Sequence, residues 1–242
     1  IYNCEDDRYP MIGKEPAKGK GRAPSNLLSS TIGDELVISN NGQSRMFSVS
    51  IKDRGAILPG GHTGKAFWYS KSDGSFTSST YYYPEHPGWV KQWNAKKVAD
   101  KYKDTSWELL HDASTYVFGK DDDRPFEIDF CGLGKTFPHP VKGDSKYFYG
   151  SLVATPFGDE LTADFAKTLI KEENLGQDKH TDFMAISFSV TDYIGHIFGP
   201  SSLEAEDNIL RVDRLLADLF RFIDEQVGLD RTLIIVSADH GM

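Results

Sequence analysis

The sequence predicts an α/β fold, with a mostly parallel sheet flanked by helices. Two continuous apolar segments, 183–190 and 233–236, are separated by a helical pattern over about 202–227. Strand, helix, strand is a βαβ unit, and unbroken apolar strands are typical of parallel strands that are buried on both faces. We therefore expect a βαβ unit in the second half of the chain.

The first half of the chain contains further segments of both kinds. A helix is expected from Ser25 or Asn26 to about Ser39, because either side chain can cap it and an apolar face follows. The remaining expected elements are a strand at 46–51, a hairpin of 67–69 with 76–82, and helices at about 88–102 and 159–174. Residues 103–158 are irregular and rich in Pro, Gly and Asp, so we expect a cap or insertion within one α/β domain spanning 1–242.

Composition excludes several classes of protein. The 242 residues carry a formal net charge of -9, which argues against a general nucleic-acid binder. No apolar run reaches about 18 residues, so no membrane span is predicted. Cys4 and Cys131 cannot form a four-cysteine zinc site; they could pair in an exported protein or remain buried thiols in the cytosol. The chain begins at Ile1 and stops just after an apolar segment, so we expect it to be truncated at both ends.

Three polar clusters each follow directly on a predicted core strand. They are Lys52-Asp53-Arg54, the segment Thr191–His196 and the segment Ser237–Gly241. Ligands of open parallel sheets bind outside the carboxyl ends of the strands. The three clusters are therefore predicted to converge on one edge of the sheet.

Two of these clusters carry side chains that suit a metal ion. Asp192 and His196 are four residues apart, which puts both on one face of a helical turn, and Asp239 and His240 can reach one metal through a turn that Gly241 permits. Carboxylate oxygen and imidazole nitrogen are zinc ligands, and two such pairs suggest two metals about 4 Å apart. The alternatives are a capping Asp with a surface His, and a turn that simply ends a strand.

The third cluster carries two cations. On a strand end, Lys52 and Arg54 would point the same way while Asp53 points opposite. An ammonium and a guanidinium facing a metal pair would hold a dianionic phosphoryl group, with the guanidinium fork taking two of its oxygens. The alternative is a solvated strand end.

These motifs together resemble one known family. The segment Ser50–Pro59, with Phe67-Trp68-Tyr69 and Thr80-Tyr81-Tyr82, resembles the phosphate-irrepressible bacterial alkaline phosphatases. The segments Thr191–Pro200 and Ala238–Gly241 are similar to the metal motifs of that family. It belongs to the alkaline phosphatase superfamily, near the type I phosphodiesterase/nucleotide pyrophosphatases.

The resemblance implies a function and a role for each candidate residue. Asp192 and His196 match ligands of one zinc ion, and Asp239 and His240 match ligands of a second. Lys52 and Arg54 match the cationic pair that contacts the phosphoryl oxygens of the substrate. The implied enzyme hydrolyses small-molecule phosphate monoesters through a covalent phosphothreonine, whose threonine lies outside this chain, and it is periplasmic or secreted.

Two other functions are compatible with the same motifs. One is a phosphodiesterase or nucleotide pyrophosphatase of the same superfamily, and the other is a non-catalytic zinc-binding remnant domain. The nucleophile and further metal ligands of the family have no counterpart here, so we expect these 242 residues alone to be inactive. The pattern specifies no oligomeric state.

Overall fold

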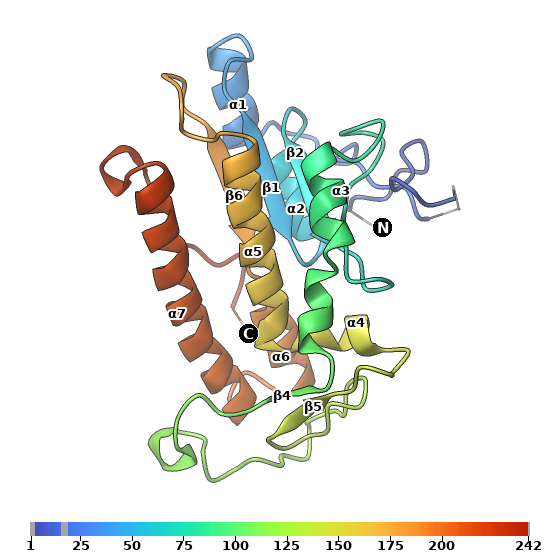
Figure 1. The fold of residues 1–242 in the computed structure, drawn as a ribbon, viewed down its shortest axis with the longest axis vertical. Coiled ribbons are helices and arrows are strands. Elements are labelled where there is room, and N and C mark those ends of the chain that lie inside the picture. The colour runs from blue at the N-terminus through green and yellow to red at the C-terminus, as the bar shows by residue number, and fades with distance from the viewer. Residues whose placement is uncertain (1–2, 16–18, 242) are drawn as a thin grey trace. The chain divides into compact units, whose positions relative to one another are not determined.

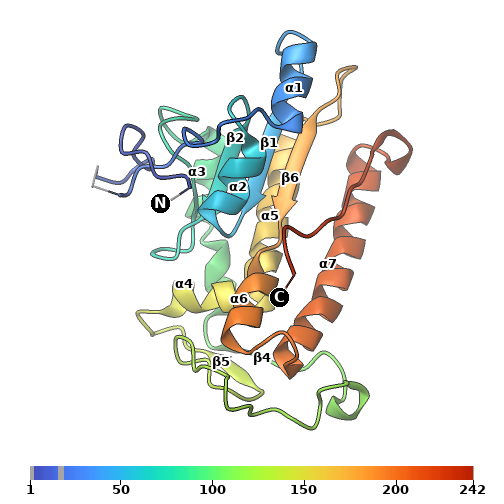
Figure 2. The same cartoon turned by 180° about the vertical axis from the view of Figure 1, so that it is seen from behind.

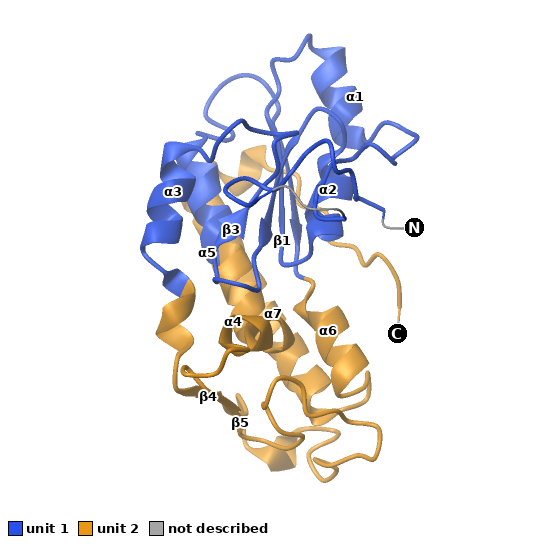
Figure 3. Cartoon of the chain, turned by 90° about the vertical axis from the view of Figure 1, so that its right-hand side faces the viewer, with its two compact units in different colours: residues 1–98, 164–188 blue, residues 99–163, 189–242 orange. Residues whose placement is uncertain are grey.

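In the computed structural model, residues 3–15 and 19–241 are described, and the chain divides into two units (Figure 3). Unit 1 comprises residues 1–98 and 164–188, and unit 2 comprises residues 99–163 and 189–242. Helix α5 (Pro156–Glu172) belongs to both, with its first half in unit 2 and its second half in unit 1.

Unit 1 is built on a four-stranded sheet in the order β3-β2-β1-β6. Strand β1 pairs in parallel with both β2 and β6, while β3 pairs antiparallel with β2. The register places Val49 of β1 opposite Phe67 of β2 and Ile186 of β6. The predicted mostly parallel sheet is thus confirmed. The strands are β1 (Met46–Ser50), β2 (Lys65–Tyr69), β3 (Phe76–Thr77) and β6 (Phe183–Ser187).

Helices cover both faces of this sheet. Helix α2 (Asp53–Gly60) packs on one face, and α3 (Gly88–Ala95) with the second half of α5 packs on the other (Figures 1 and 2). Aromatic rings fill the second of these layers: Phe165 of α5 stacks on Phe76 with 4.3 Å between ring centroids, and Trp93 of α3 meets both rings edge-on. Burial of these large rings is the main source of stabilisation between α5 and the sheet.

Helix α1 (Ile32–Ser39) begins later than the sequence suggested. The Thr31 hydroxyl accepts from the Asp34 amide at 3.1 Å, and the Asp34 carboxylate accepts from the Thr31 amide at 2.9 Å, which forms a capping box. Ser25, one of the two expected caps, instead donates its hydroxyl to Asp6. The expected start at Ser25 or Asn26 was therefore wrong, because a stronger cap follows.

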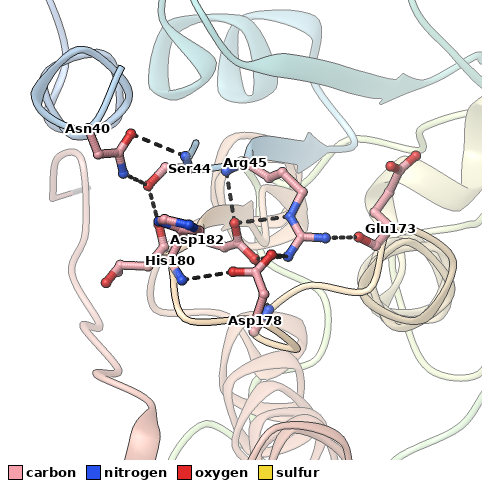
Figure 4. Close-up of polar contacts among 9 residues, drawn as sticks. Asn40, Ser44, Arg45, Glu173, Asp178, His180 and Asp182 are labelled. Carbon is pink, nitrogen blue, oxygen red and sulfur yellow. Dashed lines mark hydrogen bonds and ion pairs between the residues drawn. The ribbon is translucent and has the colours of Figure 1, made fainter. Parts of the chain in front are cut away.

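An ionic clamp fixes the starts of β1 and β6 (Figure 4). Arg45 directly precedes β1 and Asp182 directly precedes β6. The Asp182 carboxylate accepts from the backbone amide and the guanidinium of Arg45 at 2.8–3.1 Å, and from the Gly176 amide at 2.9 Å. The same guanidinium donates to Asp178 and to the carbonyl of Glu173. These contacts set the register of the two parallel strands.

Unit 2 is mainly helical. It contains α4 (Phe148–Ser151), α6 (Val190–Ile197), α7 (Leu203–Gln226) and the antiparallel pair of β4 (Thr105–Trp107) with β5 (His139–Val141). Residues 103–158 contribute β4, β5, α4 and the start of α5, joined by irregular segments. Short 3₁₀ helices occur at Ala113–Thr115, Leu152–Ala154 and Leu229–Arg231, and a further one, Val98–Tyr102, begins at the last residue of the first segment of unit 1.

A buried carboxylate organises the end of unit 2 where α7 begins. Asp207, which is fully buried on α7, accepts hydrogen bonds from four groups. The donors are the Trp107 indole at 2.6 Å, the Tyr116 hydroxyl at 2.6 Å, the Leu110 amide at 2.8 Å and the Arg211 guanidinium at 2.6 Å. These protein groups therefore satisfy the buried carboxylate of Asp207. The same hydrogen bonds connect the first turns of α7 to the segment 107–116.

The predicted strand at 233–236 is absent from the described residues. This segment has no regular structure, and the side chains of Leu233, Ile235 and Val236 are 86, 76 and 70% exposed. An apolar run becomes a strand only where its backbone groups pair with a neighbour, and no ladder of the described chain includes it. Of the predicted βαβ unit, the structure thus confirms the first strand and the long helix.

Candidate functional site

Helix α6 presents the first pair of predicted metal ligands. It follows β6 after two residues, with Asp192 in its first turn and His196 in its last. The four-residue spacing puts both side chains on one face, and His196 Nε2 lies 3.6 Å from Asp192 Oδ1. The Asp192 side chain is 21% exposed and that of His196 is 69% exposed, so Asp192 is partly buried while His196 faces solvent.

The C-terminal segment brings a third predicted ligand to this pair. His240 Nε2 lies 3.3 Å from Asp192 Oδ1 and 3.8 Å from Asp239 Oδ2. The other ring nitrogen of His240, Nδ1, lies 2.7 Å from the carbonyl oxygen of Gly241. All four predicted ligands therefore lie in one chain of contacts, with Asp192 between the two imidazoles and Asp239 at its outer, solvent-exposed end.

The four side chains are of the types that bind zinc, but they contact one another only two at a time. Two imidazoles and two carboxylates are the nitrogen and oxygen ligands that zinc takes in proteins. Within residues 3–15 and 19–241, no group of three or more His, Cys, Asp or Glu side chains is arranged to hold a metal ion. Asp192 itself, which contacts an imidazole on either side, is the group best placed to join the two halves of the set.

The cationic pair lies at the start of α2, on unit 1. Lys52 is the residue that precedes the helix and is 8% exposed, while Arg54 is the second helical residue and is exposed. The expectation of a strand end was wrong, because β1 stops at Ser50 and the chain turns directly into a helix. The alternating directions expected for Lys52, Asp53 and Arg54 do not apply in a helical turn.

Asp53, between the two cations, is paired with a cation of its own. Its carboxylate accepts from Arg22 Nε at 2.6 Å and from the Arg54 amide at 2.8 Å. An acidic side chain in the first turn also interacts favourably with the helix dipole. Arg22 therefore neutralises the Asp53 carboxylate, which leaves the positive charge of Arg54 available to an anion.

Gly55 allows this turn to lie against the sheet. A Cβ atom at this position would stand 2.5 Å from Ser50 Oγ and 3.1 Å from Ser187 Oγ, at the ends of β1 and β6. The first distance is shorter than real Cβ atoms show, and the second is tighter than most Cβ contacts. The glycine that follows Arg54 thus fixes how closely the cationic turn approaches the strand ends.

Sequence reasoning missed the buried polar residues that support α6. Asp159 on α5 is 1% exposed, and its Oδ1 accepts from the Val190 amide, the first of α6, at 3.3 Å. Burial raises the pKa of its carboxyl to about 8. In the sequence Asp159 looks like an ordinary acidic residue at a helix start, and only the tertiary packing distinguishes it.

No disulfide joins Cys4 and Cys131 in the structure. Cys4 is buried at 4% exposure against Ala56, Ile57 and Trp68, beneath α2. Burial, with a smaller contribution from the charge of Asp53, raises the pKa of its thiol to about 11. A thiol with so high a pKa is unreactive at neutral pH, so Cys4 serves the packing of unit 1.

Comparison with known proteins identifies the family. Residues 30–242 match the type I phosphodiesterase / nucleotide pyrophosphatase family. The whole chain is 43% identical to the alkaline phosphatase PhoV of Synechococcus elongatus and 38% identical to the alkaline phosphatase PafA of Elizabethkingia meningoseptica, of which it covers 44% and 45%. It is also 42% identical to a protein of Myroides odoratus named a calcium-transporting ATPase, and covers 45% of it.

The fold agrees with the sequence match. The crystal structure of wild-type alkaline phosphatase PafA superposes with a TM-score of 0.83 at 37% identity, over 94% of this chain and 44% of that one. The chain thus spans less than half the length of the relatives it matches. In the described residues, no helix combines the length and the apolar character of a membrane span. The chain belongs to the type I phosphodiesterase / nucleotide pyrophosphatase family, within the alkaline phosphatase superfamily.

Proposed function

We propose that this chain is part of a zinc-dependent phosphate monoester hydrolase, an enzyme of the alkaline phosphatase type. The observation that carries the proposal is the contact of Asp192 with both His196 and His240, which joins the two predicted ligand pairs. The identity to relatives named alkaline phosphatases supports the same reaction class.

In this proposal, Asp192 and His196 hold one zinc ion, and Asp239 and His240 contribute to a second. When bound, two zinc ions lower the pKa of an attacking oxygen and stabilise the charge on a leaving oxygen. Metal ions bind carboxylates in the ionised form and imidazoles in the neutral form, and the contribution of the protein is to place these four side chains together. Asp192, whose side chain is 21% exposed, is the least exposed of the four side chains.

Lys52 and Arg54 bind the phosphoryl group in this proposal. A phosphate monoester carries up to two negative charges on the transferring group, whereas a diester carries one, so two cations favour the monoester. The guanidinium of Arg54 can donate two parallel hydrogen bonds to two phosphoryl oxygens, and the ammonium of Lys52 acts as a point charge. Small-molecule phosphate esters are the proposed substrates.

The nucleophile of the proposed reaction lies outside this chain. The resemblance to alkaline phosphatases implies a threonine that forms a covalent phosphothreonine, which water then cleaves. No threonine of the 242 residues is assigned that role. We further propose that the full protein is exported to a periplasm or cell surface, as the same resemblance implies.

A diesterase is the second candidate, and the family match favours it. The matching family is described as type I phosphodiesterase / nucleotide pyrophosphatase, so hydrolysis of diesters by the same residues is the direct alternative. The two candidates share the metals and differ in the charge of the group that Lys52 and Arg54 contact.

The test uses the full-length protein, its zinc content and two substrates, p-nitrophenyl phosphate and bis-p-nitrophenyl phosphate. We expect zinc in the purified protein, faster turnover of the monoester, loss of activity on chelation and its return with zinc. Asp192→Ala should lose zinc and activity together, whereas Asp213→Ala, a change at an exposed acid of α7, should alter neither. Activity that survives complete removal of metal would contradict the proposal, and preferred turnover of the diester would favour the second candidate.

A further inference from the structure

The first turn of α6 is held by two buried polar side chains from other helices of unit 2. The N-cap residue Ser189 makes no capping hydrogen bond with its side chain. Asp159 of α5 instead accepts from the Val190 amide at 3.3 Å, and Asn208 of α7 donates its side-chain amide to Thr191 Oγ1 at 3.0 Å. The two bonds reach the two residues that immediately precede Asp192.

Asn208 occupies a place where an amide is costly. Its side chain is fully buried, and although its nitrogen is bonded to Thr191, its Oδ1 is buried without a hydrogen-bond partner. Burial of an unsatisfied polar atom is unfavourable, and an apolar side chain of similar size would avoid this cost. Packing alone therefore does not account for an asparagine here, whereas the bond to Thr191 does.

The turn of α7 that carries Asn208 is itself immobilised. Its neighbour Asp207 accepts four hydrogen bonds from the segment 107–116 and from Arg211. The start of this helix is further capped by Ser202, whose hydroxyl accepts from the Ala205 amide at 3.0 Å. The backbone that carries Asn208 is thus held by hydrogen bonds on both sides. A side chain can hold another residue in place only if its own backbone is fixed in this way.

We propose that Asn208 is a positioning residue for the metal centre: by holding Thr191, it fixes the direction in which Asp192 and His196 leave α6. Ligands held in place before the metal arrives bind it more tightly, because less side-chain and backbone freedom is lost on binding. This inference rests on the proposed function, since it takes Asp192 and His196 to be zinc ligands.

Three changes in the full-length protein separate positioning from simple stabilisation. Thr191→Val keeps the shape of the side chain and removes the acceptor, Thr191→Ser keeps the acceptor, and Asn208→Leu removes the donor. Thr105→Val is the matched control, because it removes a hydroxyl bonded at 2.7 Å to the carbonyl of Tyr102 in the same unit. The measurements are zinc affinity, by competition with a chromophoric chelator, and the melting temperature of the metal-free protein.

We expect Thr191→Val and Asn208→Leu each to weaken zinc binding about 10-fold or more, as loss of a group that orients a metal ligand does. The double variant should be no weaker than the weaker single variant, because both changes break one bond. Thr191→Ser and Thr105→Val should bind zinc as the unaltered protein does. Should Asn208→Leu fail to fold, the comparison of Thr191→Val with Thr191→Ser decides the matter.

Unchanged zinc affinity in Thr191→Val, with a lowered melting temperature of the metal-free form, would overturn the inference and leave the bond a purely structural one. Failure of the proposed function has a different signature. The unaltered protein would then bind no zinc, and the ligand role on which this inference rests would fall with it.

Discussion

His240 Nε2 lies 3.3 Å from Asp192 Oδ1, although the two residues come from motifs on either side of the long helix α7. The helix runs away from α6 and the chain then returns, so that the segment after it ends beside α6 (Figure 2). The two predicted ligand pairs are thereby brought into contact within unit 2.

Loss of either cation should reduce monoester hydrolysis more than diester hydrolysis. Lys52→Ala and Arg54→Ala each remove one charge that would face the second negative charge of a monoester. Each change is expected to cost about 2–4 kcal/mol at the transition state for the monoester and clearly less for the diester. Values of kcat/KM for p-nitrophenyl phosphate and bis-p-nitrophenyl phosphate measure the difference.

Lys71→Ala is the control for that comparison, since Lys71 is exposed in the turn between β2 and β3. It should leave kcat/KM for both substrates unchanged. Equal losses on both substrates in Lys52→Ala and Arg54→Ala would show that the pair serves general binding or folding and does not select monoesters.

Gly55→Ala should destabilise the protein through a steric clash. The added Cβ would stand 2.5 Å from Ser50 Oγ, so the first turn of α2 or the end of β1 has to move. Overpacking of this kind costs about 1–3 kcal/mol. Urea unfolding measures the loss, with Gly88→Ala as the control, because a Cβ at Gly88 meets nothing within 4 Å.

The same variant should also affect the cationic turn. If the start of α2 shifts, KM for the monoester should rise, because Lys52 and Arg54 leave their places together. If Gly55→Ala is as stable as Gly88→Ala, the first turn of α2 can accommodate a Cβ atom at residue 55, and this argument is wrong.

The sequence predicted those parts of the fold and site that depend on local pattern. The four-residue spacing of Asp192 and His196 put them on one helical face, and the apolar segment 183–187 is a parallel strand. The start of α2 at Asp53 was missed, because a strand end and a helix start carry the same polar residues. The segment 233–236 was misassigned, because hydrophobicity predicts a strand only where a pairing neighbour is available.

The residues that support the candidate site, Asp159 and Asn208, could not be predicted from the sequence, for a different reason. Asp159 and Asn208 are ordinary helix residues by pattern, and their importance comes from complete burial. Which polar residue of a helix is buried depends on which other helices pack on it, and that is decided at the level of the whole unit. Periodicity marks apolar faces and carries no signal for a polar residue placed within one.

Arg45→Ala should destabilise unit 1 by much more than the loss of an exposed ion pair does. The guanidinium of Arg45 bonds Asp182, whose side chain is only 6% exposed, and its loss leaves that carboxylate without its main partner. We expect the free energy of unfolding to fall by about 2–3 kcal/mol. Arg221→Ala is the matched control: its pair with Asp218 is 3.5 Å long, with side chains 68% and 54% exposed, and is worth under about 0.5 kcal/mol.

Denaturant unfolding of the two variants at one pH checks this prediction. Equal stability of Arg45→Ala and Arg221→Ala would mean that the clamp contributes nothing beyond a surface contact. Asp182→Asn offers a second route, since it keeps the shape of the side chain and removes the charge.

The buried carboxyl of Asp159 should make stability fall as pH rises toward 8. Burial raises its pKa from 3.8 to about 8 in the folded protein, so the folded state holds a proton that the unfolded state has released between these values. The unfolded state then binds fewer protons, and the free energy of unfolding decreases with pH by up to about 1.4 kcal/mol per pH unit. Asp159→Asn keeps an acceptor for the Val190 amide and stays neutral, so its stability should lack this slope.

Urea unfolding of the metal-free protein at pH 5, 6 and 7 measures both profiles. The control is Asp213→Asn, a change at an exposed residue, which should keep the slope of the unaltered protein. Parallel profiles for Asp159→Asn and the unaltered protein would contradict the prediction, because they would show that the Asp159 carboxyl is already ionised in the folded state at these pH values.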